Sequence, residues 1–169
     1  LRRRSVRFYL DRIVEFEAIE PAMRLAALSP SACNRQSYRF LFHNDKETVR
    51  KISQLPGGFT GYEVPSIVTV IACYRGYFDE RDINVPIIDA SLAVMSFLFA
   101  LETLGLSSVC MNWPSLPDYE KQMRKLVALD DDEVIVMLIG VGYPSPDGRV
   151  AYSAKRDVHD LIQWNKNVE

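Results

Sequence analysis

The chain has 169 residues, of which 48% are hydrophobic and 25% are charged, and its formal net charge is −2. This length and apolar content suit a single globular domain, residues 1–169, that buries a full core of its own. The near-neutral charge argues against a protein that binds nucleic acid through bulk positive charge, because dense basic character is confined to residues 2–7. We therefore expect no nucleic-acid partner.

The cysteines indicate the cellular compartment. Cys33, Cys73 and Cys110 lie far apart in the sequence and form no CxxC pair. An odd number without such spacing favours reduced thiols over a disulfide framework or a zinc site. No stretch of the sequence resembles a signal peptide. These features predict a cytoplasmic protein that holds no structural metal.

The first elements read as a helix, a strand and a second helix. Residues 14–28 are helical in composition, but Pro21 leaves two forms open: a short helix that starts at the proline, or two turns that meet at a kink. Residues 38–42 are aromatic-rich and extended. The polar residues 44–47 form a capping pattern that starts a helix running to about residue 55.

A buried strand over residues 66–73 precedes the longest apolar run, residues 86–104, which predicts a helix that is hydrophobic nearly all the way round. Its uncharged part, residues 90–101, is too short to cross a bilayer, so we expect no membrane partner. A helix that is apolar on every face must be buried on every face. A domain of this size rarely encloses such a helix alone, so we expect a second copy to cover it, with Phe97 and Leu98 at that contact.

Three further elements and a final turn complete the chain. The elements are a short strand over residues 107–111, an amphipathic helix over 117–129 and a strong strand over 133–141 (EVIVMLIGV). A polar tail follows and ends in an amphipathic turn around Leu161, Ile162 and Trp164. Lys155 and Arg156 lie in the polar tail before that turn.

Side chains suited to catalysis are scarce in this sequence. His43 and His159 stand in no ligand-like spacing, and no GxSxG or GxGxxG motif is present. The carboxylates of residues 130–132 read as a charged turn before a strand. An enzyme with this inventory needs a cofactor for the difficult chemical step. We therefore expect no catalytic side chain and no metal site.

Two polar stretches remain. Residues 2–7 read RRRSVR and residues 29–40 read SPSACNRQSYRF. Taken alone, the first is a solvated terminus and the second is a helix stop followed by a turn, because Pro30 ends the preceding helix. Ser31 and Asn34 then lie on a turn that directs hydrogen-bonding groups away from the packed elements.

In this order and spacing the two stretches together resemble the FMN-dependent nitroreductase family. The matching positions are Arg3, Arg4, Ser5 and Arg7, and then Pro30, Ser31, Asn34, Gln36, Tyr38 and Phe40. The resemblance extends more weakly through most of the chain. It implies an α+β fold in three layers, with a mostly antiparallel central sheet flanked by helices. It also implies a homodimer with two FMN sites at the interface, because long central helices form the dimer contact in this family.

Flavin mononucleotide suits the residues of both stretches. Its phosphate is a dianion that guanidinium groups bind in bidentate fashion, and Arg3 and Arg7 offer two such groups within one short segment. Ser31, Asn34 and Gln36 supply polar groups for the pyrimidine edge of the flavin ring.

The resemblance implies two further parts of the site. A late basic residue reaches the phosphate in the family, and here this is Lys155 or Arg156. Backbone amides that follow the short strand lie near the flavin N5, which here points to Met111, Asn112 and Trp113. The family often has a glycine at this point, where this chain has Asn112 and Trp113. The Trp113 ring would either narrow access to the flavin or pack in the dimer core.

The activity implied by the resemblance is a two-step, ping-pong cycle. NADH or NADPH reduces FMN, and an electron-poor small molecule such as a nitroaromatic, a quinone or an enone then reoxidises it. Both substrates use the flavin pocket in turn, so no dinucleotide-binding motif is required. Two alternatives stay open: a flavin-binding protein of other purpose, and a basic-armed interaction domain in which residues 2–7 bind the phosphates of a nucleic acid or a lipid.

Overall fold

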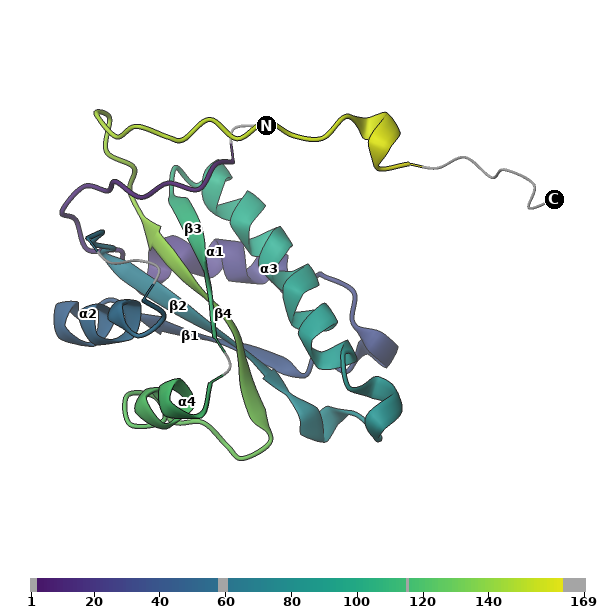
Figure 1. The fold of residues 1–169 in the computed structure, drawn as a ribbon. Coiled ribbons are helices and arrows are strands. Elements are labelled where there is room, and N and C mark those ends of the chain that lie inside the picture. The colour runs from purple at the N-terminus through teal and green to yellow at the C-terminus, as the bar shows by residue number, and fades with distance from the viewer. Residues whose placement is uncertain (1–2, 58–60, 115, 163–169) are drawn as a thin grey trace.

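The extended segments of the chain pair into one sheet. The computed structural model describes residues 3–57, 61–114 and 116–162 (Figure 1). Its strands follow the order β1-β2-β4-β3, with every neighbouring pair antiparallel: β1 (Tyr38–His43), β2 (Ser66–Cys73), β4 (Glu133–Gly142) and β3 (Ser107–Asn112). The helices are α1 (Phe16–Ala26), α2 (Lys46–Gln54), α3 (Val85–Thr103) and α4 (Pro117–Met123).

The helices lie in two layers, one on each face of the sheet (Figure 1). α1 and α3 pack on one face through a cluster that includes Ile19 and Phe97 together with Val68 of β2. α2 and α4 pack on the other face through a second cluster, which includes Ile52 and Met123. The predicted α+β architecture, with an antiparallel sheet between layers of helices, is therefore confirmed.

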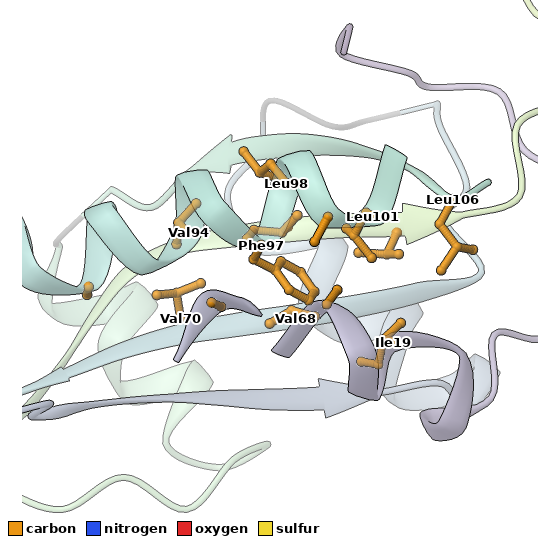
Figure 2. Packing of buried hydrophobic residues seen from close by; sticks show 14 of the residues in the cluster. Ile19, Val68, Val70, Val94, Phe97, Leu98, Leu101 and Leu106 are labelled. Carbon is orange, nitrogen blue, oxygen red and sulfur yellow. The ribbon is translucent and has the colours of Figure 1, made fainter. Parts of the chain in front are cut away.

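α3 supplies more buried residues to the first of these clusters than any other element, and its inner face is shown in Figure 2. By length and composition the segment Glu80–Thr103 could cross a membrane, but the inner face of α3 is packed against the sheet and α1 as a core helix. Phe97 is 0% exposed and Leu98 is 4% exposed. Both side chains belong to the core of one protomer, so their assignment to a contact between two copies is wrong.

The outward side of α3 is nevertheless apolar. Ile87 is exposed near its start, and Ile88, Leu92, Met95 and Phe99 are exposed along its length; we call these last four the outer stripe of α3. The spacing of four, three and four residues places them along one face of the helix. A single copy of the chain therefore leaves a continuous apolar face of its longest helix in water.

Two helices differ from their predicted forms. α1 is one continuous helix, and Pro21 lies inside it at an exposed position. α4 ends at Met123, whereas a longer helix was predicted from the amphipathic pattern. Beyond it the chain turns, and Arg124 donates to the backbone carbonyl oxygen of Leu129 at 2.9 Å. A short 3-10 helix, Val158–Asp160, comes just before the final turn predicted around Leu161 and Ile162, and Trp164 lies outside the described residues.

An ion pair fixes the start of β4 to β1. Glu133 is 3% exposed, and its two carboxylate oxygens accept hydrogen bonds of 2.7 and 2.6 Å from the Arg39 guanidinium. These bonds hold the pKa of Glu133 at about 2, below its ordinary value of 4.5. Because the folded-state pKa is the lower one, the carboxylate stabilises the fold above pH 4.5 and loses this contribution as the pH falls towards 2.

We expect Glu133→Gln to lower the free energy of unfolding by about 3 kcal/mol at neutral pH, since each unit of pKa shift corresponds to about 1.4 kcal/mol. The difference from the wild type should shrink as the pH falls through the same window. Urea denaturation at a series of pH values measures it, with Asp131→Asn as a control that removes a carboxylate from the exposed turn nearby. A difference that stays constant down to pH 2 would contradict the ion-pair account.

Candidate functional site

The N-terminal segment lies beside β3 at the edge of the sheet. Ser5 forms a parallel bridge with Ser108, and the Val6 N–H donates to the Ser108 carbonyl oxygen at 3.0 Å. Burial raises the pKa of the Cys110 thiol, and the positive charge of Arg3 opposes that rise. Arg3 precedes Ser5 by two residues, so it lies on the segment that runs beside β3.

Arg7 lies on the same N-terminal segment as Arg3. Burial raises the pKa of the Tyr9 hydroxyl, and the positive charge of Arg7 opposes this shift. Within the described part of the chain, neither Arg3 nor Arg7 forms an ion pair with a carboxylate. Two uncompensated guanidinium groups on one short segment form a site suited to a multiply charged anion.

A buried hydroxyl lies next to this segment. Ser108 is 1% exposed, and its Oγ has no hydrogen-bond partner among the described residues. Buried polar atoms are nearly always hydrogen-bonded, so an orphaned hydroxyl calls for a water or a bound ligand. Its position beside Ser5 makes the start of β3 a suitable place for a polar ligand.

The second predicted half of the site is an unusual loop between α1 and β1. Cys33, Asn34 and Gln36 have φ values of 51°, 55° and 50°, in the left-handed region that side chains disfavour. Internal hydrogen bonds hold this shape. The Gln36 N–H donates to the Ser31 Oγ at 3.0 Å, and the Gln36 Nε2 donates to the Asn34 Oδ1 at 2.8 Å. Asn34 and Gln36 are exposed, so a strained loop presents their amides to the surface.

This loop is fastened to its surroundings at both ends. The Ala32 N–H donates to the Oδ2 of Asp89, on α3, at 2.9 Å. At the other end, the Ser37 hydroxyl donates to the Cys73 carbonyl oxygen at 2.8 Å, and the Cys73 N–H donates to the Ser37 carbonyl oxygen at 2.9 Å. The loop is thus tied to the N-terminal end of α3 and to the end of β2.

The end of β3 presents its side chains to alternate faces. Met111 and Trp113 are buried in the second core, beneath α4, whereas Asn112 is exposed. The Trp113 ring is 4% exposed, and its Nε1–H donates to the Glu120 Oε1 at 2.6 Å. The ring neither narrows access to a flavin nor packs in a dimer core, because it packs within its own protomer. Any contact of this segment with a cofactor is left to the backbone and to Asn112.

Lys155 and Arg156 lie on an extended C-terminal arm that runs away from the body of the protein (Figure 1). Both residues are exposed, and Arg156 donates to the backbone carbonyl oxygen of Asp160, in the same arm, at 2.8 Å. Pro30 and Arg4 are also exposed. Their predicted part in cofactor binding stays a prediction.

The two halves of the predicted site lie at opposite ends of α3. The loop is hydrogen-bonded to Asp89 near the start of this helix, while the helix ends at Thr103, shortly before the strand that pairs with Ser5. From Asp89 to Thr103 the helix alone rises by about 20 Å. One protomer therefore does not bring Arg3 and Arg7 together with Asn34 and Gln36.

Three residues of this region were not identified from the sequence. Asp89 and Tyr77 hold the loop, and Ser108 lies beside the basic segment. One feature of the sequence could have identified Asp89. It is a carboxylate within an otherwise apolar helix, and a buried carboxylate needs hydrogen-bond donors. No feature of the sequence identifies Tyr77 or Ser108, since their importance depends on contacts between distant segments.

The chain matches the family model described as the nitroreductase family over residues 1–59 and 59–143. A protein of Archaeoglobus fulgidus, provisionally named an NADH dehydrogenase/NAD(P)H nitroreductase, is 29% identical over 147 residues, which span 86% of this chain and 83% of the relative. A similarly named protein of Methanothermobacter thermautotrophicus is 29% identical over 165 residues, covering 96% of this chain and 84% of the relative.

Solved structures share the fold. One from Parabacteroides distasonis, again provisionally named an NADH dehydrogenase/NAD(P)H nitroreductase, superposes with a TM-score of 0.81 at 28% identity, covering 97% of this chain and 94% of that one. An FMN-dependent nitroreductase from Clostridium difficile superposes with a TM-score of 0.80 at 24% identity, covering 98% and 96% of the two chains. The sequence match over most of the chain and the shared architecture lead to one conclusion: this chain belongs to the nitroreductase family, a family of oxidoreductases.

Proposed function

We propose that this chain is an FMN-dependent oxidoreductase that takes electrons from NADH or NADPH and passes them to an electron-poor small molecule. The relatives' names support the reductant, and the name of the Clostridium difficile structure supports the cofactor. The observation that carries the proposal is that Arg3 and Arg7 lie on the segment that pairs with β3, and that neither has a carboxylate partner among the described residues.

The residues present fit the cofactor. Arg3 and Arg7 would hold the phosphate, and the orphaned Ser108 hydroxyl lies beside the same segment. The exposed amides of Asn34 and Gln36 would meet the polar edge of the ring. When bound, FMN supplies the hydride acceptance and electron transfer that this inventory of side chains lacks. The residues of the chain would therefore bind FMN, orient it and polarise its ring.

We further propose that the site is shared between two copies of the chain. Pairing the outer stripe of α3 with its counterpart about a two-fold axis would remove this apolar face from water. In an antiparallel pairing of the two helices, the start of one α3 meets the end of the other. The loop of one protomer, with Asn34 and Gln36, would then approach Arg3 and Arg7 of its partner. Each dimer would hold two equivalent sites.

In this proposal the reductant and the acceptor use one pocket in turn, which gives a ping-pong cycle. The small-molecule acceptor is a nitroaromatic, a quinone or an enone, and no nucleic acid or membrane takes part. The three cysteines form no disulfide, which fits a cytoplasmic enzyme.

The test is an anaerobic titration of the protein loaded with FMN. NADH or NADPH should bleach the bound flavin without any acceptor, and a quinone or a nitroaromatic should restore its colour. Initial rates at several fixed acceptor concentrations should give parallel double-reciprocal lines. If neither nicotinamide reduces fully bound FMN within minutes, a flavin-binding protein of other purpose replaces the reductase. If the purified protein binds no flavin, the basic-armed interaction domain becomes the better account.

We expect Asn34→Ala to slow the reductive half-reaction more than it weakens FMN binding. An amide at the ring edge stabilises the charge that grows during reduction, whereas the phosphate contacts of Arg3 and Arg7 are unchanged. Stopped-flow reduction at saturating FMN and a fluorescence titration of the apoprotein separate the two effects. Equal losses in both measurements would show that Asn34 acts only in binding.

A further inference from the structure

One face of α3 carries polar groups that hold the chain leading into the loop. The Ser29 Oγ lies 2.7 Å from the Ser96 Oγ, and the Ala32 N–H donates to the Asp89 Oδ2 at 2.9 Å. Asp89 and Ser96 are seven residues apart, which places them two turns apart on the same face of the helix. The segment before the strained loop is therefore fastened to α3 at two points.

Asp89 is the central member of this arrangement. It is 3% exposed, and the same oxygen that accepts from Ala32 also accepts a 2.8 Å hydrogen bond from the Tyr77 hydroxyl. Burial and this bond raise the pKa of Tyr77, and the negative charge of Asp89 adds to the raised pKa of Tyr38. A carboxylate buried this deeply is costly unless donors surround it, and a loop N–H is one of the two donors that it has among the described residues.

The internal bonds of the loop fix Asn34 and Gln36 relative to each other but not relative to the rest of the protein. That placement comes from the attachments at its ends: the Ala32 bond to Asp89, next to Cys33, and the Ser37 bonds to Cys73, next to Gln36. A loop in a disfavoured backbone conformation drifts towards commoner conformations once an attachment is lost.

We propose that Asp89, braced by Tyr77, is the positioning residue of this loop: it sets where Asn34 and Gln36 meet the cofactor. This inference rests on the proposed function, because it takes the loop to face FMN. A misplaced loop loses more of its interaction with the reduced, more charged ring than with the oxidised ring. The midpoint potential of the bound flavin should therefore fall.

The sign of this shift separates positioning from simple electrostatics. Removing a negative charge near the flavin would by itself favour the reduced form and raise the potential. For Asp89→Ala, positioning predicts the opposite: an about tenfold loss of preference for the reduced form, which is a fall of about 30 mV. Asp89→Asn keeps a hydrogen-bond acceptor without the charge, so its potential should equal or exceed that of the wild type.

Tyr77→Phe keeps the charge of Asp89 and removes only the brace, so we expect an about threefold effect, a fall of about 15 mV. Tyr74→Phe is the matched control. The Tyr74 hydroxyl donates to the Ile83 carbonyl oxygen at 3.1 Å, in the same connecting segment, and has no hydrogen bond to the loop among the described residues. Its potential should be unchanged.

A second readout needs no flavin. Hydrogen exchange of the ligand-free protein should speed up at the amides of Ala32 and Gln36 in Asp89→Ala and Tyr77→Phe, and not in Tyr74→Phe. Equal exchange in all variants would overturn the proposal. So would potentials that rise alike in Asp89→Ala and Asp89→Asn, or a Tyr77→Phe variant that matches Tyr74→Phe. If Asp89→Ala does not fold, Asp89→Asn and Tyr77→Phe decide the question. A wild type that binds no FMN would refute the proposed function instead, while the exchange data still test the anchor.

Discussion

Replacing Arg3 or Arg7 with alanine is expected to weaken FMN binding by about 10- to 100-fold, since a charge-assisted hydrogen bond contributes about 1.5–3 kcal/mol. Both guanidinium groups lie at the edge of β3 without a carboxylate partner among the described residues, so a bound phosphate would be their main counter-charge. The double variant should lose most, although neighbouring substitutions need not add. Fluorescence titration of the apoprotein with FMN gives the dissociation constants.

Arg50→Ala is the control for loss of an arginine charge. Arg50 is exposed on α2, on the other face of the sheet from α3. Its affinity for FMN should equal that of the wild type, and its salt dependence should be unchanged, whereas that of Arg3→Ala should flatten. Unchanged affinity in both Arg3→Ala and Arg7→Ala would remove these residues from the site.

The second large effect concerns the outer stripe of α3. We expect Leu92→Asp or Phe99→Asp to dissociate the proposed dimer, because each substitution would place a charge in an apolar contact and the two-fold axis would repeat it. Both side chains are exposed in one protomer, so the isolated chain should still fold. Sedimentation equilibrium of the wild type and the variants measures the change in mass.

Leu116→Asp tests whether any exposed leucine would have this effect. Leu116 is an exposed residue just before α4, remote from the outer stripe, and its substitution should leave the proposed dimer intact. Phe97→Asp should instead unfold the protomer, since Phe97 is wholly buried in the first core. A stable wild-type monomer that holds FMN would contradict the shared site.

Much of the fold could be predicted because strong local patterns agree with the packing. β2 and β4 are mostly apolar and rich in β-branched residues, and they are the two central strands. The Asp45 side chain caps α2 by accepting from the Thr48 N–H at 2.8 Å, as the capping pattern indicated. The predicted length of α4 was too great, because the amphipathic spacing continues through turns that pack on the same core.

The candidate site was predicted in composition but not in arrangement. Alternation along β3 decides that Trp113 faces the core and Asn112 does not, and this depends on where the extended segment ends. The positive φ values of Cys33 and Gln36 could not be expected from residues that seldom adopt them. The two halves of the site lie at opposite ends of α3 because of the topology of the fold, and sequence motifs carry no information about that topology.

Mixing two impaired variants tests the central claim most directly. Arg3→Ala/Arg7→Ala should bind FMN poorly in both of its sites, and Asn34→Ala should bind FMN but reduce it slowly. If each site combines the arginines of one protomer with the loop of its partner, a mixed dimer contains one site without substitutions. After random exchange of equal amounts, half of the dimers are mixed, so about a quarter of all sites should regain tight binding and fast reduction.

The measurement is anaerobic stopped-flow reduction of FMN by NADH or NADPH, before and after the two variants exchange subunits. The shared-site account predicts that a phase with the wild-type rate appears only after exchange. A mixture whose trace remains the sum of the two separate variants, although sedimentation shows that subunits have exchanged, would place each site within one protomer and contradict the account.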